Sequence, residues 1–386
     1  MLQATPSEVP SSGKAASSKG AIRAAVLLLL HHSATAAGSL YGITRVRNSA
    51  SCSGAVSGCA QLVSVDAATG ALANVGAGHD PLVAVGDLAV AAGGTFYTLA
   101  DGWNGTGTVL LGIDVADGSE ACRRAVPSIG EVAIVGGGQS LVHDATHGRL
   151  LLAGLALNET TQHYHHLVLA SKLPGCGPFE QLGTFGDGDF EPMAHATTFD
   201  AATQRLFVTV STGAHGYGLA TVHVPAAAPP AGAPAGPLPW SVVPMEDGAT
   251  HVLWGAAWDA VGKVLAGPAV RAGGPGVDWR TLDPVRGAWS SRALAGDNAS
   301  AFTSLNGNLG SVRAHDDAAG SGSGALYSLL GQGSGDDDAA HTMVLAEIDV
   351  ATGRVVSSAP LHGDVGESGS ILLQMALDAS TPLEGM

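Results

Sequence analysis

Six short polar segments, spread along the 386-residue chain, each carry a carboxylate between runs of alternating apolar residues. These carboxylates are those of Asp80, Glu131, Glu191, Asp247, Asp297 and Glu367. Hard oxygen ligands from several loops suit Ca²⁺, and carboxylates gathered without a cation raise one another's pKa. The six residues therefore form a candidate calcium site if the fold gathers their segments. The alternative interpretation is that they only cap strand ends.

Two of these segments also place a histidine four residues after the carboxylate, in Glu191–His195 and Asp247–His251. A carboxylate and an imidazole together can bind Zn²⁺ or Mn²⁺, or supply an acid and a base. His195 and His251 are therefore the candidate catalytic residues. The alternative is that each imidazole forms hydrogen bonds only within its own loop.

A local histidine cluster lies at His163-Tyr164-His165-His166. On a strand, alternate side chains point to opposite faces, so at most two of the three imidazoles could meet one metal ion. We expect this cluster to be a solvated strand end.

The elements that must position these residues are strands joined by a repeated turn. LVSVDAATGAL (62–72) returns as LAEIDVATGRVV (345–356), with weaker copies at 110–118 and 281–289. Alternation, then Asp-x-x-Thr-Gly, then alternation again predicts a β-hairpin, because Asp accepts backbone N–H bonds and Gly supplies a positive φ. The aspartates of these turns are predicted to be structural: Asp66, Asp114, Asp283 and Asp349.

A second series of aspartates counts the repeat units. Asp144, Asp200, Asp259 and Asp316 are separated by 56, 59 and 57 residues, and one further period reaches Asp378. A period of this length is typical of propeller blades with long loops. One period back reaches the apolar run around Val90, which gives six units.

The sequence therefore predicts an all-β, six-bladed β-propeller of four-stranded antiparallel blades. We expect blades at 39–78 (completed by 369–383), 82–128, 132–184, 193–244, 249–295 and 301–361, so that the two ends of the chain share one sheet. Such closure removes exposed edges from the ring. The six polar segments would then be the linkers between blades and would meet at one mouth of the central channel.

At the level of superfamily, these repeats resemble those of secreted propellers with quinoprotein-like or YVTN-like repeats. The segment LDPVRGAW (282–289) is similar to one quinoprotein repeat, including its Trp. The other blades lack that Trp, so the resemblance does not imply a quinone cofactor. Such propellers include enzymes, binding scaffolds and ligand carriers, and the fold does not choose among them.

Composition limits the partners. Lys and Arg number 17 against 33 Asp and Glu, which gives a net charge of −16 and argues against nucleic acid and anionic membranes. Only 13% of residues are charged and 55 are Gly, which fits short strands with many turns. We expect a protein, a carbohydrate or a small molecule as ligand.

The N-terminus resembles a secretory signal peptide. Lys14, Lys19 and Arg23 precede the run AAVLLLL, and small residues follow to Ala37. We predict a signal peptide with an N-terminal extension over 1–37, a secreted protein, and one propeller domain over 38–386 with a Pro/Ala-rich surface loop at 225–239. A signal anchor or a flexible start is the alternative, and no other stretch is a candidate membrane span.

An oxidising compartment would allow the four cysteines to pair. We expect disulfides Cys52–Cys59 and Cys122–Cys176, with four buried free thiols as the alternative. Three N-x-Ser/Thr sequons are candidate glycosylation sites, at Asn104, Asn158 and Asn298.

The leading functional prediction is a secreted binding module that uses the acidic channel mouth, with a central Ca²⁺ as the candidate cofactor. Exposed tryptophans would support it, and Trp103, Trp240 and Trp279 are expected in loops, with Trp254 and Trp258 on strands.

The alternative is a metal-dependent hydrolase or lyase, similar to six-bladed lactonases. In that case Asp80, Glu191, Asp247 and Asp297 would hold the metal, with His195 or His251 transferring protons. A purely structural wall or surface protein is the third alternative. The chain has no G-x-S-x-G, H-E-x-x-H, phosphate-loop or dinucleotide motif, so those enzyme classes lack support.

Overall fold

The structure is a computed structural model in which one compact unit spans Gly38–Glu384. For parts of several strands only the backbone is described. The described residues are 39–46, 59–79, 82–102, 108–127, 132–134, 140–158, 163–186, 191–211, 217–230, 235–244, 256–271, 276–296, 298–305, 312–313, 324–332, 342–363 and 371–378. The predicted signal peptide therefore lies outside the described residues. No helix in the described part of the chain is long and apolar enough to cross a bilayer.

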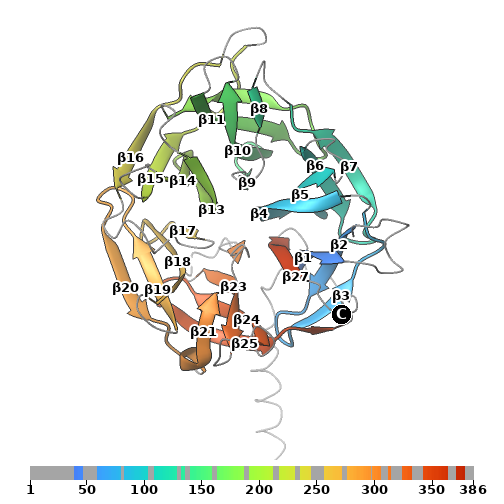
Figure 1. Cartoon of the computed structure of the whole chain (residues 1–386), viewed down its shortest axis with the longest axis vertical. Helices are drawn as coiled ribbons and strands as arrows, with labels where there is room; N and C mark the ends of the chain where they lie inside the picture. The colour runs from blue at the N-terminus through green and yellow to red at the C-terminus, as the bar shows by residue number, and fades with distance from the viewer. Residues whose placement is uncertain are drawn as a thin grey trace, which may run out of the picture. The chain divides into compact units, whose positions relative to one another are not determined.

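The strands form six sheets arranged as a ring around a centre (Figure 1). Written from the centre outward, blade 1 is β27(Ile371–Asp378), β1(Ser39–Val46), β2(Cys59–Val65) and β3(Ala71–Asn74); blade 2 is β4(Leu82–Ala92), β5(Thr95–Gly102), β6(Thr108–Asp114) and β7(Glu120–Ala125); blade 3 is β8(Val132–Ile134) and β9(Ser140–Asp144), then β10(Arg149–Asn158), β11(His163–Lys172) and β12(Glu180–Phe185). Blade 4 is β13(Glu191–Asp200), β14(Arg205–Ser211), β15(Tyr217–His223) and β16(Trp240–Pro244); blade 5 is β17(Ala257–Asp259), β18(Val264–Val270), β19(Val277–Leu282) and β20(Trp289–Ala293); blade 6 is β21(Phe302–Leu305) and β22(Val312–Arg313), then β23(Ala325–Gln332), β24(Thr342–Asp349) and β25(Arg354–Pro360). The chain is a six-bladed β-propeller, as the repeat predicts.

Blade 1 closes the ring by joining both ends of the chain. β27 pairs antiparallel with β1, from Ser39 opposite Asp378 to Arg45 opposite Ile371. On the outer side, the short β26(His362–Gly363) pairs parallel with β3. The predicted sharing of one sheet by the two ends is confirmed, and it is reinforced at the outer edge.

Each blade is apolar on both faces because it packs between two neighbours. The described residues form six core clusters, and each cluster joins residues of two adjacent blades. On β10, for example, Leu150 and Leu152 pack toward blade 2, while Leu151 and Ala153 pack toward blade 4. Period-2 alternation therefore sends successive apolar side chains to different junctions. This arrangement explains the near-continuous apolar runs of the middle strands.

The Asp-x-x-x-Gly hairpins are turns, as predicted. Asp66 Oδ1 accepts hydrogen bonds from the backbone N–H groups of Ala68 and Thr69, at 2.8 and 3.0 Å. Gly70, at φ 75°, donates its N–H to the Asp66 carbonyl at 2.7 Å. The turns at Asp114, Asp283 and Asp349 repeat this pattern.

The turn glycines also pack against the preceding blade, and the sequence does not reveal this role. A Cβ on any of the four would lie within 2.4 Å of an atom of the neighbouring blade. These approaches are Gly70 to the Pro360 carbonyl oxygen, Gly118 to the Val75 carbonyl oxygen, Gly287 to Val243 Cγ1 and Gly353 to Trp279 Cγ. The glycine therefore serves both the turn and the junction between blades.

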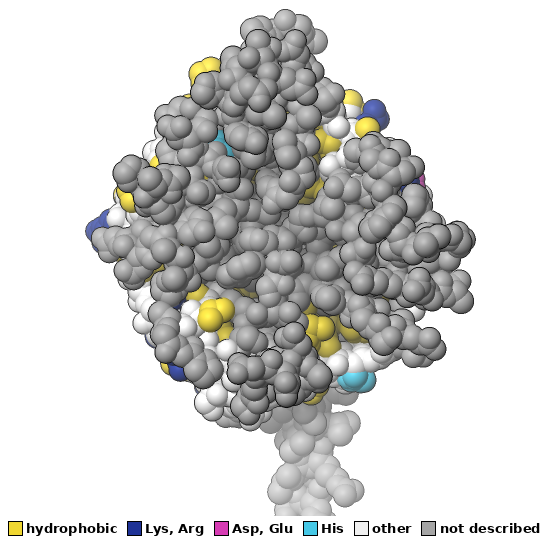
Figure 2. Space-filling model, in the orientation of Figure 1, with side chains coloured by type: hydrophobic (Ala, Val, Ile, Leu, Met, Phe, Trp, Pro, Cys, Tyr) yellow, Lys and Arg dark blue, Asp and Glu magenta, His cyan; other side chains and the backbone are white. Residues whose placement is uncertain are grey.

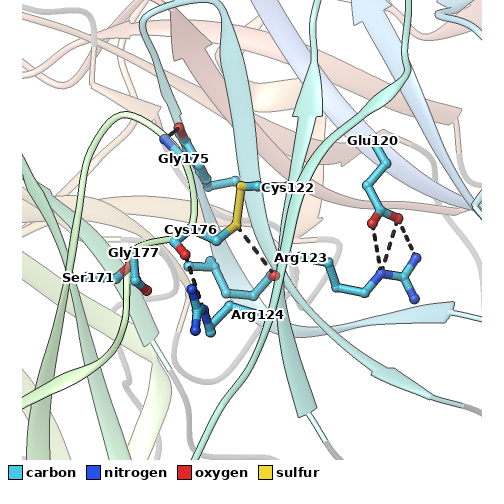
Figure 3. The surroundings of a disulfide bond; sticks show 10 residues. Glu120, Cys122, Arg123, Arg124, Ser171, Gly175, Cys176 and Gly177 are labelled. Carbon is cyan, nitrogen blue, oxygen red and sulfur yellow. Dashed lines mark hydrogen bonds and ion pairs between the residues drawn. A yellow bond between two sulfur atoms is a disulfide. The ribbon is translucent and has the colours of Figure 1, made fainter.

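A disulfide takes the place of the glycine turn between blades 2 and 3. Cys122 of β7 is bonded to Cys176, which lies between β11 and β12 (Figure 3). Arg124 Nε donates to the Cys176 carbonyl at 3.2 Å, and the Gly175 N–H donates to the Tyr97 hydroxyl at 3.1 Å. The predicted Cys122–Cys176 pair is thus confirmed. Cys59 is also disulfide-bonded, whereas Cys52, its predicted partner, lies outside the described residues.

The Pro/Ala-rich segment occupies the corresponding hairpin between blades 3 and 4. The buried Leu238 donates its N–H to the Thr184 carbonyl of β12 at 2.7 Å, and Thr184 forms a parallel bridge with Pro237. At the other end of the segment, Arg149 Nη2 of blade 3 donates to the Pro225 carbonyl at 2.7 Å. Both described ends of this excursion are therefore held against blade 3.

Candidate functional site

The innermost strands bring the starts of the blades together. β4, β9, β13, β17 and β27 surround the centre of the ring (Figure 1). Residues of β4 come within 8 Å (Cα–Cα) of β27 and β9, and also of β13, which belongs to blade 4 rather than to an adjacent blade. Each innermost strand follows an interblade linker, so one end of the channel is the linker end.

Extra residues interrupt the innermost strands near this end. In β4, the pairing passes from Val85–Leu99 to Val90–Tyr97, so four residues face the single Thr98. In β13, it passes from Met193–Thr209 to Thr198–Phe207, so four residues face the single Val208. Each strand thus carries three more residues than its partner.

In blades 3 and 6 the sequence also has extra residues between the described pairs, although these extra residues lie outside the described part of the chain. Ile134 pairs with Ala156 and Ser140 pairs with Ala153, so the innermost chain has five residues where β10 has two. In blade 6, six residues between Leu305 and Val312 stand where β23 has two. In all four blades the irregularity begins after three or four paired residues, which places it at a similar depth in the channel. Bulges of this kind are over-represented next to active sites.

Two candidate residues lie in these bulges. One was missed by the analysis of the sequence, and the other was predicted from it. Asp87 lies in the bulge of β4, and His195 lies in the bulge of β13. Both are assigned by backbone position, and the two strands approach each other across the channel. A carboxylate and an imidazole are residue types that can bind a polar ligand or a cation, so these two positions are candidates by backbone placement alone. The signal for Asp87 was the Gly86-Asp87 pair that interrupts an apolar strand.

The predicted acidic ring lies almost entirely outside the described residues. Of its six members, only Glu191 is described, by its backbone, as the first residue of β13 and the partner of Ser211. The other five ring members lie outside the described residues: Asp80, Glu131, Asp247, Asp297 and Glu367. The second candidate histidine, His251, also lies outside them. Among the described residues no group of three or more His, Cys, Asp or Glu side chains could hold a metal ion. The ring therefore stays a prediction.

The carboxylates at the opposite end of the innermost strands have structural roles. Asp144, Asp200 and Asp259 end β9, β13 and β17, and all three are buried. Asp200 Oδ1 accepts from the Ala202 N–H at 3.1 Å, and Asp259 Oδ1 accepts from the Val261 N–H at 3.0 Å. These side chains fix the first hairpin of each blade, so the hairpin end is a poor candidate for a binding site.

Asp144 belongs to a buried polar cluster. Its Oδ2 accepts from Arg149 Nε and lies against His147 Nδ1, both at 2.8 Å. Burial alone raises the pKa of this carboxyl, but the hydrogen bonds from Arg149, His147 and Gln204 outweigh it and hold the pKa below its ordinary value of 3.8. Because Arg149 also binds the Pro225 carbonyl, the cluster stabilises the junction of blades 3 and 4.

Two expectations about aromatic and histidine residues are wrong. His166 is not part of a solvated strand end, because it is fully buried in β11 and stacks on Phe185 with ring centroids 5.0 Å apart. Trp240 and Trp279 lie in β16 and β19 rather than in loops. Trp279 is fully buried, and Trp258 is buried against Phe207. The large exposed apolar side chains of the described residues are four valines, so no exposed tryptophan patch is present there.

Basic side chains are peripheral on the face shown in Figure 2. The described Lys and Arg side chains visible in this view lie around its rim. No described Lys or Arg side chain is visible at the centre of that face.

Comparison with known proteins finds only distant similarities, all to solved structures. No family model matches the chain, and no curated protein matches it significantly. Similar solved structures include an exo-β-1,3-galactanase from Phanerochaete chrysosporium with β-1,3-galactotriose (13% identity, TM-score 0.41, covering 73% of this chain and 63% of that chain). Others are an α-L-arabinofuranosidase from Podospora anserina with cellotriose (13%, 0.39, 69% and 90%) and BamB from Moraxella catarrhalis (12%, 0.30, 78% and 72%). The chain spans less than two thirds of the galactanase's length. The assignment of a propeller fold rests on the six sheets of the structure itself.

Proposed function

We propose that this chain is a secreted ligand-binding module whose site is the linker end of the channel, between the interrupted innermost strands and the acidic linkers. The observation that carries the proposal is the repeated insertion at one depth in blades 2, 3, 4 and 6. A ring that needed only to be stable would keep regular ladders there, because every extra residue costs paired backbone groups.

Charge and chemistry favour a cation as part of the bound state. The linkers carry Asp80, Glu131, Glu191, Asp247, Asp297 and Glu367, and the bulge of β4 adds Asp87. Oxygen ligands of this kind suit Ca²⁺, and a cation would relieve their mutual repulsion. The Cys122–Cys176 disulfide is compatible with the oxidising compartment that a secreted protein would meet.

Elemental analysis of the purified protein, paired with melting curves with and without chelator, tests the proposal. We expect about one equivalent of Ca²⁺ and a melting temperature that falls on chelation, since a ligand of the native state stabilises it by mass action. Asp87→Asn and Glu191→Gln should weaken Ca²⁺ binding. Asp117→Asn, in an exposed turn of blade 2, is the matched control. Absence of both the metal and the chelator response would refute the cation site.

A second candidate function is a metal-dependent hydrolase, favoured by the position of His195 within a channel bulge. In that reaction the metal ion would polarise a substrate oxygen and His195 would transfer a proton. Hydrolysis of lactones and esters by the metal-loaded protein, lost in His195→Gln with Ca²⁺ binding retained, would support this function. Ca²⁺ binding without hydrolysis of any ester or lactone would refute this second function and leave the binding module as the proposed function.

A further inference from the structure

Asn298 lies in an exposed turn of the linker between blades 5 and 6. It has a left-handed backbone conformation, φ 62°, and precedes the 3₁₀ turn η2(Ala299–Ala301) without a side-chain capping hydrogen bond. Asn tolerates this conformation better than other residues with a side chain. The turn therefore depends on the left-handed backbone of Asn298, while the side-chain amide of Asn298 forms no capping hydrogen bond.

The neighbouring residues hold this turn by backbone contacts. Ala295 forms a parallel bridge with Arg354 of blade 6, and the Ala301 N–H donates to the Asn298 carbonyl at 2.9 Å. Ala299 is buried, whereas Asn298 and Ser300 are exposed. Asn298, which would accept the glycan, and Ser300, which supplies the hydroxyl of the sequon, are thus both exposed to solvent. The turn that carries them is held by backbone hydrogen bonds.

Of the other two sequon asparagines, Asn104 lies outside the described residues, and Asn158 has a different environment from that of Asn298. Asn158 lies in β10, where its backbone pairs with Val132 on one side and His163 on the other. A bulky glycan requires a surface position, and a residue inside a sheet has neighbours on both sides. Asn298 is therefore the better placed of the two to carry a glycan in the folded protein.

We infer that Asn298 is an N-glycosylation site. In the transfer, the bond between the sugar C1 and the pyrophosphate of a lipid-linked oligosaccharide breaks, C1 bonds to Asn298 Nδ2, the nitrogen loses a proton, and the lipid pyrophosphate leaves. A glycan there would project from the linker between blades 5 and 6, next in sequence to Asp297. This inference rests on the secretory route of the proposed function, but it needs no ligand or cation in the channel, so loss of Ca²⁺ binding would leave it intact.

Glycopeptide mapping of the full chain, secreted from a eukaryotic host, tests the site. We expect a glycan on the Asn298 peptide, with conversion of that Asn to Asp on enzymatic deglycosylation. Ser300→Ala and Asn298→Asp should both remove it, and Ser300→Thr should retain it. Ser300→Ala is the decisive variant, because it leaves the left-handed residue in place and should leave the melting temperature of the deglycosylated protein unchanged.

Two results would overturn the inference. One is a secreted protein in which Asn298 is unmodified, whether or not Asn104 or Asn158 carries a glycan. The other is a protein that stays inside the host cell and carries no glycan at Asn298.

Discussion

Gly353 of blade 6 packs directly on the ring of Trp279 in blade 5. A Cβ at position 353 would lie 2.4 Å from Trp279 Cγ, and the residue has φ 61°. The indole is fully buried, so it cannot move into solvent. Gly353 therefore satisfies both the turn geometry of its own blade and the packing against the preceding blade.

Gly353→Ala should destabilise the protein by about 2 to 5 kcal/mol, the sum of left-handed strain and overpacking. Gly148→Ala is the matched control: Gly148 has φ 58°, but a Cβ there meets nothing within 4 Å. It should show only the strain, about 1 to 2 kcal/mol. Urea unfolding of both variants gives the comparison, and equal losses would contradict the junction role.

Removal of the Cys122–Cys176 bond should lower the free energy of unfolding by about 4 kcal/mol, because it closes a loop with a sequence separation of 54. Cys122→Ser, Cys176→Ser and the double variant should be destabilised equally, as measured by urea unfolding. Additive losses would show that the cysteines contribute separately rather than through the bond.

Asp144→Ala should cost about 3 to 5 kcal/mol, because it leaves the buried Arg149 without its carboxylate. Since the folded-state pKa of Asp144 is lowered, its contribution is complete above the ordinary carboxyl pKa and is lost as pH falls through the folded-state pKa. Unfolding followed across acidic pH should therefore be less pH-dependent in the variant. Asp66→Ala, in an exposed turn, is the control, and an equal loss there would contradict the role of burial.

Tyr327 should make stability fall at alkaline pH. Burial, with a smaller effect of the Glu347 charge, raises its pKa from 10.0 to about 12. The neutral phenol is therefore favoured in the folded state, and its contribution to stability is present below pH 10 and is lost as pH rises toward 12. Tyr327→Phe should abolish this part of the alkaline loss. Glu347→Gln should move the phenolate titration, followed by ultraviolet absorbance, slightly to lower pH, and an unchanged titration would contradict the smaller contribution assigned to the Glu347 charge.

Much of the fold could be predicted because it depends on local signals that repeat. The turn at Asp66–Gly70 needs a side-chain acceptor and a residue tolerant of positive φ, and both are visible in five letters of sequence. The spacing of Asp144, Asp200 and Asp259 gave the blade number, since each ends an innermost strand. The predicted sharing of one sheet by the two ends is seen in the pairing of β27 with β1, in which Asp378 lies opposite Ser39.

The sequence by itself determined the blades, their order and their hairpins, because these depend on residues near one another in the chain. Only the tertiary structure decided what lies between blades and inside the channel. The burial of Trp279 and His166, the second role of Gly353, and the approach of the strands that carry Asp87 and His195 all depend on segments far apart in sequence. The bulges were also hidden, because three extra residues in a period that already varies from 56 to 59 leave no mark until the partner strand fixes the register.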